Sequence, residues 1–272
     1  MALGPFTDAS GVRVSLPEPP RRIVSLIPSI TETLFALGLG EAVAGCTIYC
    51  TQPPEGVAGK TRVGGEKNPK LEVIRELGAD LVIANIEENV REHIETLRGW
   101  GIPVYVTYPR TVADGVRLIR ELGAVAGAGE RAAQIAGPLE KRYAQLRARL
   151  EGRRRKRVFC PIWRNPYMTV NGDTYVHDML AVCGGDNVFS TLASRYPEVT
   201  LEEVAASGPE VILLPDEPYR FRRAHLADFA PHPEIPAVKN GRIHLVDGKL
   251  LSWYGPRIGE ALEALPALLA SA

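Results

Sequence analysis

Two segments of this chain repeat one another, and the repeat limits the folds that the chain can adopt. The first is LEVIRELGADLVIA, residues 71–84, and the second is LEEVAASGPEVILL, residues 201–214. Each reads as Leu-Glu, a short helix, glycine, a small residue or proline, an acid and an apolar strand. Such strands are typical of parallel sheets in alternating βα folds. One repetition is too little for a solenoid, so it predicts two similar α/β lobes.

A long amphipathic pattern over residues 129–152 separates the two repeats. Its apolar residues recur every three or four positions, as one stripe of a helix does: Ile135, Leu139, Tyr143, Leu146 and Leu150. We expect a connecting helix here, between an N-terminal lobe (residues 1–128) and a C-terminal lobe (residues 153–272). Pro138 lies inside the pattern and predicts a kink, or a helix that begins only near Leu139.

The charge balance argues against nucleic-acid binding. The chain has 32 basic and 32 acidic residues, whereas nucleic-acid binders carry a basic excess. The one long basic run, Arg153–Arg157, follows the predicted helix, whose C-terminus attracts cations. No apolar run approaches the roughly 20 residues of a membrane span. Residues 1–20 lack a secretory signal pattern, so the protein is either cytoplasmic or an exported protein given without its signal.

Four cysteines complete no recognisable metal site. Cys46 and Cys50 are four positions apart, and Cys160 and Cys183 lie far along the chain. No second pair or histidine cluster completes a zinc pattern. Buried thiols are therefore expected, with a Cys46–Cys50 disulfide as the alternative in an exported protein.

Glu72 and Glu202 occupy equivalent places in the first turns of the two repeated helices. An acid there offsets the positive end of the helix dipole, and Thr200 with Glu203 would form a capping box. The other interpretation is functional: one exposed acid on each lobe would dock a basic partner.

Nearly the whole chain resembles a known family, the class III (helical-backbone) substrate-binding proteins of ABC importers, and especially the vitamin B12 binders. The resemblance is carried by the two repeats, the predicted connecting helix and these segments: Pro20–Leu26, Pro28-Ser29, Thr31-Glu32, Arg157–Phe159, Cys183–Phe189 and Pro256–Ile258. It implies an α/β fold of two βα lobes, each around a mainly parallel sheet, joined by one long helix with the ligand in the cleft between them. It also implies a monomeric periplasmic protein whose acids, here Glu72 and Glu202, meet arginines of a permease dimer.

The ligand residues expected from this fold lie in loops at the carboxyl ends of strands, where open parallel sheets bind ligands. The candidates are Tyr49, Asn85, Trp163, Tyr167, Tyr196, Asp247, Trp253 and Tyr254. Aromatic faces and a few polar groups suit a broad macrocycle with an amide rim. Ordinary core packing is the alternative for each aromatic residue, and Tyr49 and the Trp253-Tyr254 pair are the foremost candidates.

The implied ligand is a cobalt corrinoid, either cobalamin or a precursor, with no resident cofactor or metal. The sequence departs from the vitamin-binder pattern, because Asn85 stands where a tryptophan can occur and Glu66-Lys67 replaces another aromatic position. Two other chelates stay open. A ferric siderophore would use cations, for which Arg164, Arg220, Arg222 and Arg223 are available; haem would use an axial ligand such as Tyr49, Tyr167 or His177.

Two further classes have less support. A bare-metal receptor needs several histidines and carboxylates, and the five histidines here form no cluster. An enzyme could use Asp173 and His177 as an acid–base pair one helical turn apart. The chain has no nucleophile elbow, Walker loop or Rossmann fingerprint beside such a pair. We therefore expect a binding protein rather than an enzyme.

Overall fold

The structure, a computed structural model, describes residues 3–270. The described chain divides into two compact units. The first contains the chain up to Pro109, Asp114–Pro138 and Tyr254–Pro256; the second contains Arg110–Ala113, Leu139–Trp253 and the chain from Arg257 onward. The lobe boundaries expected from the sequence stay a prediction.

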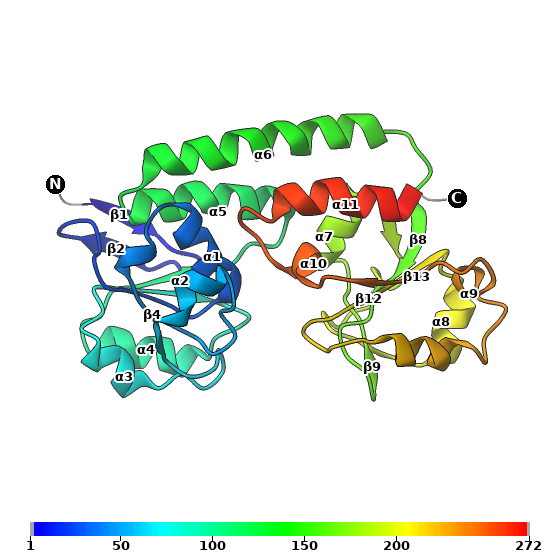
Figure 1. Cartoon of the computed structure of the whole chain (residues 1–272), viewed down its shortest axis with the longest axis horizontal. Coiled ribbons are helices and arrows are strands. Elements are labelled where there is room, and N and C mark those ends of the chain that lie inside the picture. The colour runs from blue at the N-terminus through cyan, green and yellow to red at the C-terminus, as the bar shows by residue number, and fades with distance from the viewer. Residues whose placement is uncertain (1–2, 271–272) are drawn as a thin grey trace. The chain divides into compact units, whose positions relative to one another are not determined.

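The elements that begin before residue 150 are, in chain order, β1 (Leu3–Thr7), β2 (Arg13–Leu16), β3 (Ile23–Ser25), α1 (Pro28–Ala36), η1 (Gly40–Ala42), β4 (Val43–Cys46), α2 (Pro54–Ala58), β5 (Thr61–Arg62), α3 (Leu71–Glu76), β6 (Leu81–Asn85), α4 (Arg91–Gly99), β7 (Val104–Thr107), α5 (Val112–Val125) and α6 (Gly129–Leu150). Figure 1 shows their course in blue to green.

The first unit is built on a five-stranded sheet in the order β5-β4-β3-β6-β7, with every pairing parallel. Alternate side chains of a strand point to opposite faces. One face of β6 therefore carries Val82 and Ala84, which pack in a core with Ile74 of α3 and with Ile94 and Leu97 of α4. Figure 1 shows α3 and α4 on this side of the sheet.

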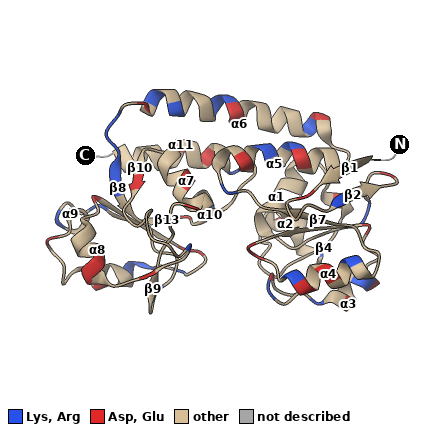
Figure 2. Cartoon of the chain, turned by 180° about the vertical axis from the view of Figure 1, so that it is seen from behind, with Lys and Arg blue, Asp and Glu red and all other residues tan. Residues whose placement is uncertain are grey.

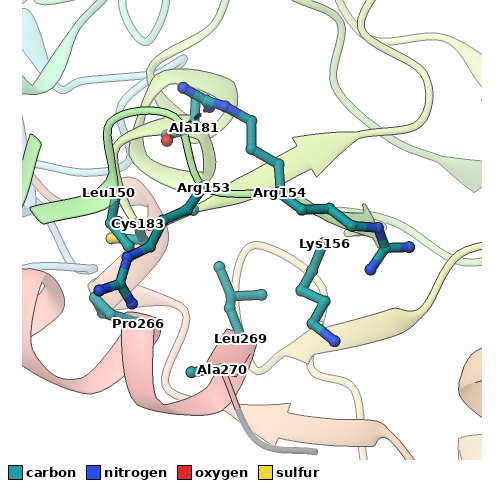
Figure 3. A pocket seen from close by; sticks show the side chains of 11 residues that line it. Leu150, Arg153, Arg154, Lys156, Ala181, Cys183, Pro266, Leu269 and Ala270 are labelled. Carbon is teal, nitrogen blue, oxygen red and sulfur yellow. Dashed lines mark hydrogen bonds between the residues drawn. The ribbon is translucent and has the colours of Figure 1, made fainter.

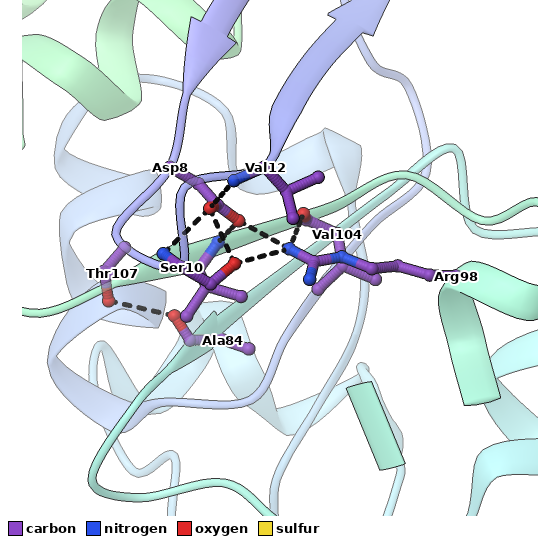
Figure 4. A network of polar contacts seen from close by, with 8 residues as sticks. Asp8, Ser10, Val12, Ala84, Arg98, Val104 and Thr107 are labelled. Atoms are coloured by element: carbon purple, nitrogen blue, oxygen red, sulfur yellow. Dashed lines mark hydrogen bonds and ion pairs between the residues drawn. The ribbon is translucent and has the colours of Figure 1, made fainter. Parts of the chain in front are cut away.

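The β1–β2 hairpin is attached to this sheet through Asp8 (Figure 4). The Asp8 carboxylate is fully buried and pairs with Arg98 of α4. It also accepts backbone hydrogen bonds from Ser10 at 2.9 Å, Val12 at 3.0 Å and Val106 of β7 at 3.1 Å. A buried carboxylate is tolerated because it is paired and hydrogen-bonded on both oxygens.

Helix α6 runs without a break through Pro138, from Gly129 to Leu150. A late start of the helix near Leu139 is therefore wrong, and a kink at Pro138 stays a prediction. Pro138 lies on an exposed face, so the carbonyl that loses its partner can meet water. Figure 2 shows an acid near the start of α6 and basic residues near its end, an arrangement that suits the helix dipole.

The later elements are β8 (Lys156–Phe159), β9 (Tyr167–Met168), α7 (Tyr175–Val182), β10 (Gly185–Asn187), β11 (Glu198–Val199), α8 (Leu201–Ser207), β12 (Val211–Pro215), η2 (Arg223–Phe229), α9 (Pro236–Lys239), β13 (Ile243–Val246), α10 (Lys249–Ser252) and α11 (Ile258–Ala270). The sheet of the second unit has the order β10-β8-β12-β13, again wholly parallel. Its core includes Phe159, Ile212 and Phe229. The two parallel sheets confirm the predicted α/β class.

At the sequence repeat, both units have the same two hydrogen bonds between the strand of the repeat and the strand beside it. Asp80 accepts from the backbone N–H of Arg22 at 3.0 Å, and the amide of Asp80 donates to the carbonyl of Arg22 at 3.1 Å. Glu210 and Arg157 make the equivalent two bonds at 3.1 and 2.8 Å. Each acid therefore sets the register between its own strand and the strand beside it.

The arginine side chains add further bonds between the same segments. In the second unit these arginines belong to the basic run, Arg153–Arg157. Arg22 donates to the carbonyl of Leu77, and Arg157 donates to the equivalent carbonyl of Ser207. Arg154 forms a two-pronged pair with Glu210, both bonds at 3.0 Å. Two arginines of the basic run therefore have a role beyond the end of α6, because they tie β8 to the helix and strand of the second repeat.

Candidate ligand-binding surfaces

Three exposed apolar side chains lie at the carboxyl edge of the sheet in the first unit. Ile48 and Tyr49 follow β4, and Ile86 follows β6; their exposed fractions are 54%, 56% and 43%. The amide of Ile48 donates to the carbonyl of Gly64 at 2.9 Å. A Cβ at Gly65 would lie 3.4 Å from the Tyr49 ring, so the glycine loop packs beside it. Strands that run parallel bring these loops to one edge.

Asn85 lies beneath this edge, with 4% of its surface exposed. Its side-chain oxygen accepts from the amide of Glu87 at 2.8 Å, and its Nδ2 donates to the Tyr254 hydroxyl at 3.1 Å. Burial raises the pKa of Tyr254 above its ordinary value, so this phenol stays neutral. Asn85 and Tyr254 therefore support the exposed loop from below, and their burial argues against direct contact with a ligand.

A second aromatic edge lies in the other unit, where β8, β12 and β13 end. Trp163 follows β8 and Tyr219 follows β12, and their rings meet edge to face with centroids 5.5 Å apart. Trp163 is 43% exposed. The next residue, Arg164, makes two hydrogen bonds to Asp228, at 2.6 and 3.0 Å. Tyr167 is buried and donates to the same carboxylate at 2.6 Å, so it supports this edge from below.

The remaining candidates in the second unit differ in exposure. Tyr196 is 39% exposed, with the Arg195 guanidinium 5.8 Å from its ring centre. Asp247 is half-buried after β13, where it accepts from the amide of Lys249 at 2.9 Å. Trp253 is buried, with Lys249 and Arg257 over its ring at 5.8 and 5.5 Å. Of the eight sequence candidates, Tyr49, Trp163 and Tyr196 are therefore the exposed aromatic residues.

Ile48 and Ile86 are not among the eight candidate residues named from the sequence, although Ile86 lies in the loop that Asn85 begins. Both are apolar residues beside polar neighbours in loops that follow buried strands. An apolar side chain in such a loop is a usable signal, but an isolated exposed isoleucine is too common to be informative. The sheet makes the signal meaningful because it brings the two loops to one edge.

Glu72 and Glu202 are both exposed at the second position of their helices, α3 and α8. The pKa of Glu202 is held below its ordinary value, first by a hydrogen bond from its own backbone amide and then by Thr200. Thr200 and Glu203 form the predicted capping box, with bonds of 3.2 and 2.7 Å. Glu202 itself is not part of that box, so its carboxylate stays available to a partner.

The proposed acid–base pair finds no support in the geometry. Asp173 is held by Arg110 at 3.1 Å and by Arg195 at 2.7 Å. His177 lies in α7, where burial lowers its pKa. Among residues 3–270, no cluster of three metal-binding side chains occurs. Within the same range, no helix is long and apolar enough to cross a membrane.

A small cavity in the second unit is separate from the aromatic edge (Figure 3). It measures about 160 Å³ and is lined by the chain from Arg153 to Lys156, Cys183 and the end of α11, including Leu269. Ligand pockets for molecules of drug size usually span about 300–1,000 Å³. This cavity is therefore too small for a macrocyclic chelate.

Comparison with known proteins shows the family to which this chain belongs. A family model described as a periplasmic binding protein matches residues 23–250. The chain is 29% identical to a vitamin B12-binding protein of Vibrio parahaemolyticus over 249 residues, which covers 90% of this chain and 88% of that protein. It is 33% identical to a vitamin B12-binding protein of Salmonella typhimurium over 193 residues, which is 71% of each chain.

Solved structures show the same fold. The periplasmic vitamin B12 binding protein BtuF of Vibrio cholerae is similar with a TM-score of 0.82 and 26% identity, over 92% of this chain and 97% of that one. The periplasmic heme-binding protein RhuT of Roseiflexus sp. RS-1 gives a TM-score of 0.81 and 27% identity, over 92% and 98%. The chain therefore belongs to the periplasmic binding protein family, and it is the substrate-binding component of an ABC importer rather than an enzyme.

Proposed function

We propose that this protein captures a corrinoid, cobalamin or one of its precursors, in the periplasm and delivers it to an ABC permease dimer. The observation that carries the proposal is that each unit exposes large aromatic or apolar side chains in its loops: Tyr49 with Ile48 and Ile86 on one, Trp163 and Tyr196 on the other. Flat apolar faces suit the faces of a corrin ring, and nearby amides and hydroxyls suit its amide rim. The vitamin B12-binding relatives support the same ligand class.

Calorimetric titration tests this ligand assignment. The purified protein, as a monomer, is titrated with cyanocobalamin, dicyanocobinamide, haemin and a ferric hydroxamate chelate. We expect heat with at least one corrinoid. Heat with haemin alone, or with the ferric chelate alone, would overturn the corrinoid proposal. Comparing cyanocobalamin with dicyanocobinamide then separates the vitamin from a precursor, because only the former carries the nucleotide loop.

Tyr49→Ala tests the contribution of the exposed aromatic edge. A lost aromatic contact is worth about 1 kcal/mol or more, so corrinoid binding should weaken roughly fivefold to tenfold. The matched control is Tyr143→Ala, which removes a partly exposed tyrosine from α6 and should leave the dissociation constant unchanged. Equal effects of the two substitutions would remove Tyr49 from the proposed surface.

One observation favours a second ligand class, an anionic ferric chelate. Arg220, Arg222 and Arg223 are exposed between the end of β12 and the first residue of η2. In the described part of the chain, none of these three guanidinium groups forms an ion pair with an acid. If the ferric chelate is the ligand, the triple glutamine variant should lose its binding, whereas corrinoid binding should change little.

We further propose that Glu72 and Glu202 dock the protein on arginines of the permease. Both carboxylates are exposed at equivalent places in the repeat, and a rim charge acts mainly on the association rate and its salt dependence. Glu72→Gln with Glu202→Gln should abolish association with the reconstituted permease and leave ligand binding intact. The matched control is Glu76→Gln with Glu198→Gln, two other exposed acids, one on each unit. Undiminished association of the first variant would return both acids to a helix-dipole role.

A further inference from the structure

Cys46 and Cys50 form a polar cluster at the base of the turn that carries Tyr49. Cys46 ends β4, and Cys50 closes the turn by donating its backbone N–H to the carbonyl of Thr47 at 3.2 Å. Both cysteines are fully buried. The tip of the turn, Ile48 and Tyr49, is more than half exposed. The cluster therefore lies under one of the exposed aromatic side chains described above.

The surroundings of Cys50 favour the thiolate. Its pKa lies below the ordinary value of a thiol, first because of a hydrogen bond from the Cys46 thiol, against the opposing effect of burial. The Thr47 hydroxyl lies 3.2 Å from Cys50 Sγ and supplies a second donor. Thr31 Oγ1 is 3.1 Å away, but it is also 3.0 Å from the carbonyl of Ile27, which competes for its single proton. Cys46 keeps its own proton, because its pKa is raised by the bond that it donates.

Arg62 adds a fixed positive charge to the pair. Its Nη1 lies 3.2 Å from Cys46 Sγ, 2.9 Å from the carbonyl of Thr47 and 2.8 Å from the carbonyl of Cys50. A guanidinium anchored in this way lowers the pKa of Cys46 against the larger effects of its bond to Cys50 and of burial, so it stabilises negative charge on the pair, and it repels a metal cation. The cluster therefore favours thiol chemistry over a soft-metal site.

The other two cysteines provide an internal contrast. Cys160 and Cys183 are as deeply buried as the pair. Burial raises the pKa of each thiol to about 12. Since the thiolate is the reactive form, burial alone makes these two inert and the polar cluster makes Cys50 different.

We propose that Cys46 and Cys50 are a redox-active dithiol, which a low-molecular-weight disulfide oxidises to an intrachain Cys46–Cys50 disulfide at the base of the Tyr49 turn. Opening of the turn, whose tip is exposed, gives the oxidant access to Cys50. The Cys50 thiolate attacks one sulfur of oxidised glutathione, and one glutathione leaves as its thiolate and takes up a proton. Cys46 then loses its proton and attacks Cys50 Sγ, which releases the second glutathione. Two protein thiols and one glutathione disulfide become one protein disulfide and two glutathione thiols.

The test uses the intact, reduced protein in graded ratios of oxidised to reduced glutathione. The reaction is quenched in acid, the protein is alkylated under denaturing conditions, and the peptides are mapped by mass spectrometry. The peptide with Cys46 and Cys50 should lose two hydrogens and escape alkylation, whereas Cys160 and Cys183 should be alkylated fully. The pair should react at least about tenfold faster than either control thiol. The readout is a covalent bond, so it does not depend on which ligand the protein binds.

Two variants assign the roles of the thiols. In Cys46→Ser, Cys50 should accumulate as a stable mixed disulfide with glutathione, because the resolving thiol is absent. In Cys50→Ser, Cys46 should form less mixed disulfide than Cys50 does in Cys46→Ser, because the Thr47 hydroxyl lies beside Cys50 Sγ. Circular dichroism and the protection of Cys160 and Cys183 show that each variant is folded. Absence of the intrachain disulfide at every glutathione ratio, or equal modification of all four cysteines, would overturn the proposal.

Discussion

At the residue scale, Asp228 shows how one side chain organises the second aromatic edge. It accepts two hydrogen bonds from Arg164 and one from Tyr167. The Arg164 hydrogen bond is the main reason why the pKa of Asp228 lies below its ordinary value, and Tyr167 adds to it against the effect of burial. Arg164 and Tyr167 thereby receive fixed positions beside Trp163, although neither needs to contact the ligand.

This arrangement predicts a pH dependence for Asp228→Asn. A carboxyl with a lowered folded-state pKa stabilises the fold at pH values above its unfolded pKa of about 3.9, and this contribution is lost as the pH falls through the folded-state pKa. Urea unfolding at pH 7 should show the variant less stable than the parent protein. The difference should shrink as the pH is lowered below about 4. Asp186→Asn, at an exposed position in β10, is the control. A difference that stays constant down to pH 3 would contradict this account.

At the element scale, α3 and α8 are equivalent helices with different first turns. Helix α8 begins at Thr200 with a capping box, whereas α3 begins after Lys70, whose side chain makes no capping bond. Both helices end at a glycine with a left-handed backbone, Gly78 with φ of 61° and Gly208 with φ of 56°. The repeat therefore conserves the geometry at the helix end more closely than the capping at the start.

The difference in capping gives a matched pair of substitutions. Thr200→Ala should cost about 1 kcal/mol in the free energy of unfolding, because the amide of Glu203 loses its acceptor. Lys70→Ala, at the equivalent position, should change the free energy by less than about 0.5 kcal/mol. Denaturant unfolding of the two variants measures both values. Equal costs would mean that the capping box adds nothing to α8.

At the scale of the whole molecule, each unit has a hydrophobic core of its own. The core around Val82 and Ile74 lies entirely in the first unit, and the core around Phe159 and Phe229 lies entirely in the second. Tryptophans report on both, since Trp100 packs against the first core and Trp163 and Trp253 belong to the second unit. A destabilising substitution should therefore lower the stability mainly of the unit that contains it.

Asp8→Asn tests this independence. The substitution leaves Arg98 without its buried partner and should cost about 3 kcal/mol. In a variant with Trp100 as the only tryptophan, Asp8→Asn should lower the denaturation midpoint. In a variant that keeps Trp163 and Trp253 but has Phe at position 100, the midpoint should move much less. Thr200→Ala should show the reverse pattern. Identical shifts with both sets of tryptophans would mean that the two units unfold as one.

The sequence predicted the parts of the fold that local patterns encode. The apolar strands after Asp80 and Glu210 and the capping box at Thr200 follow from the spacing of residue types, and so does the helix expected over residues 129–152 and found over residues 129–150. The buried thiols follow from the general tendency of free cysteine to be buried. The late helix start at Pro138 was wrong, because an exposed proline interrupts only one hydrogen bond and the rest of the turn stays helical. The role of Arg154 was not predicted, because the acid that pairs with it is Glu210, more than 50 residues away in the chain.

The candidate ligand-binding residues show the same division between what local patterns encode and what they do not. The sequence by itself determined the α/β class and the repeat with its two equivalent acids, since these features depend on local periodicity. It also predicted that the ligand residues lie in loops after strands, from the general rule for parallel sheets. Only the tertiary structure decided that Tyr49, Trp163 and Tyr196 are exposed whereas Asn85, Tyr167, Trp253 and Tyr254 are buried. It also brought Thr31, Arg62 and the two cysteines together under the Tyr49 turn. Both the exposure of a residue and the composition of such a cluster depend on which side chains from distant strands lie on the same face. The pairing of the strands in the sheet decides this.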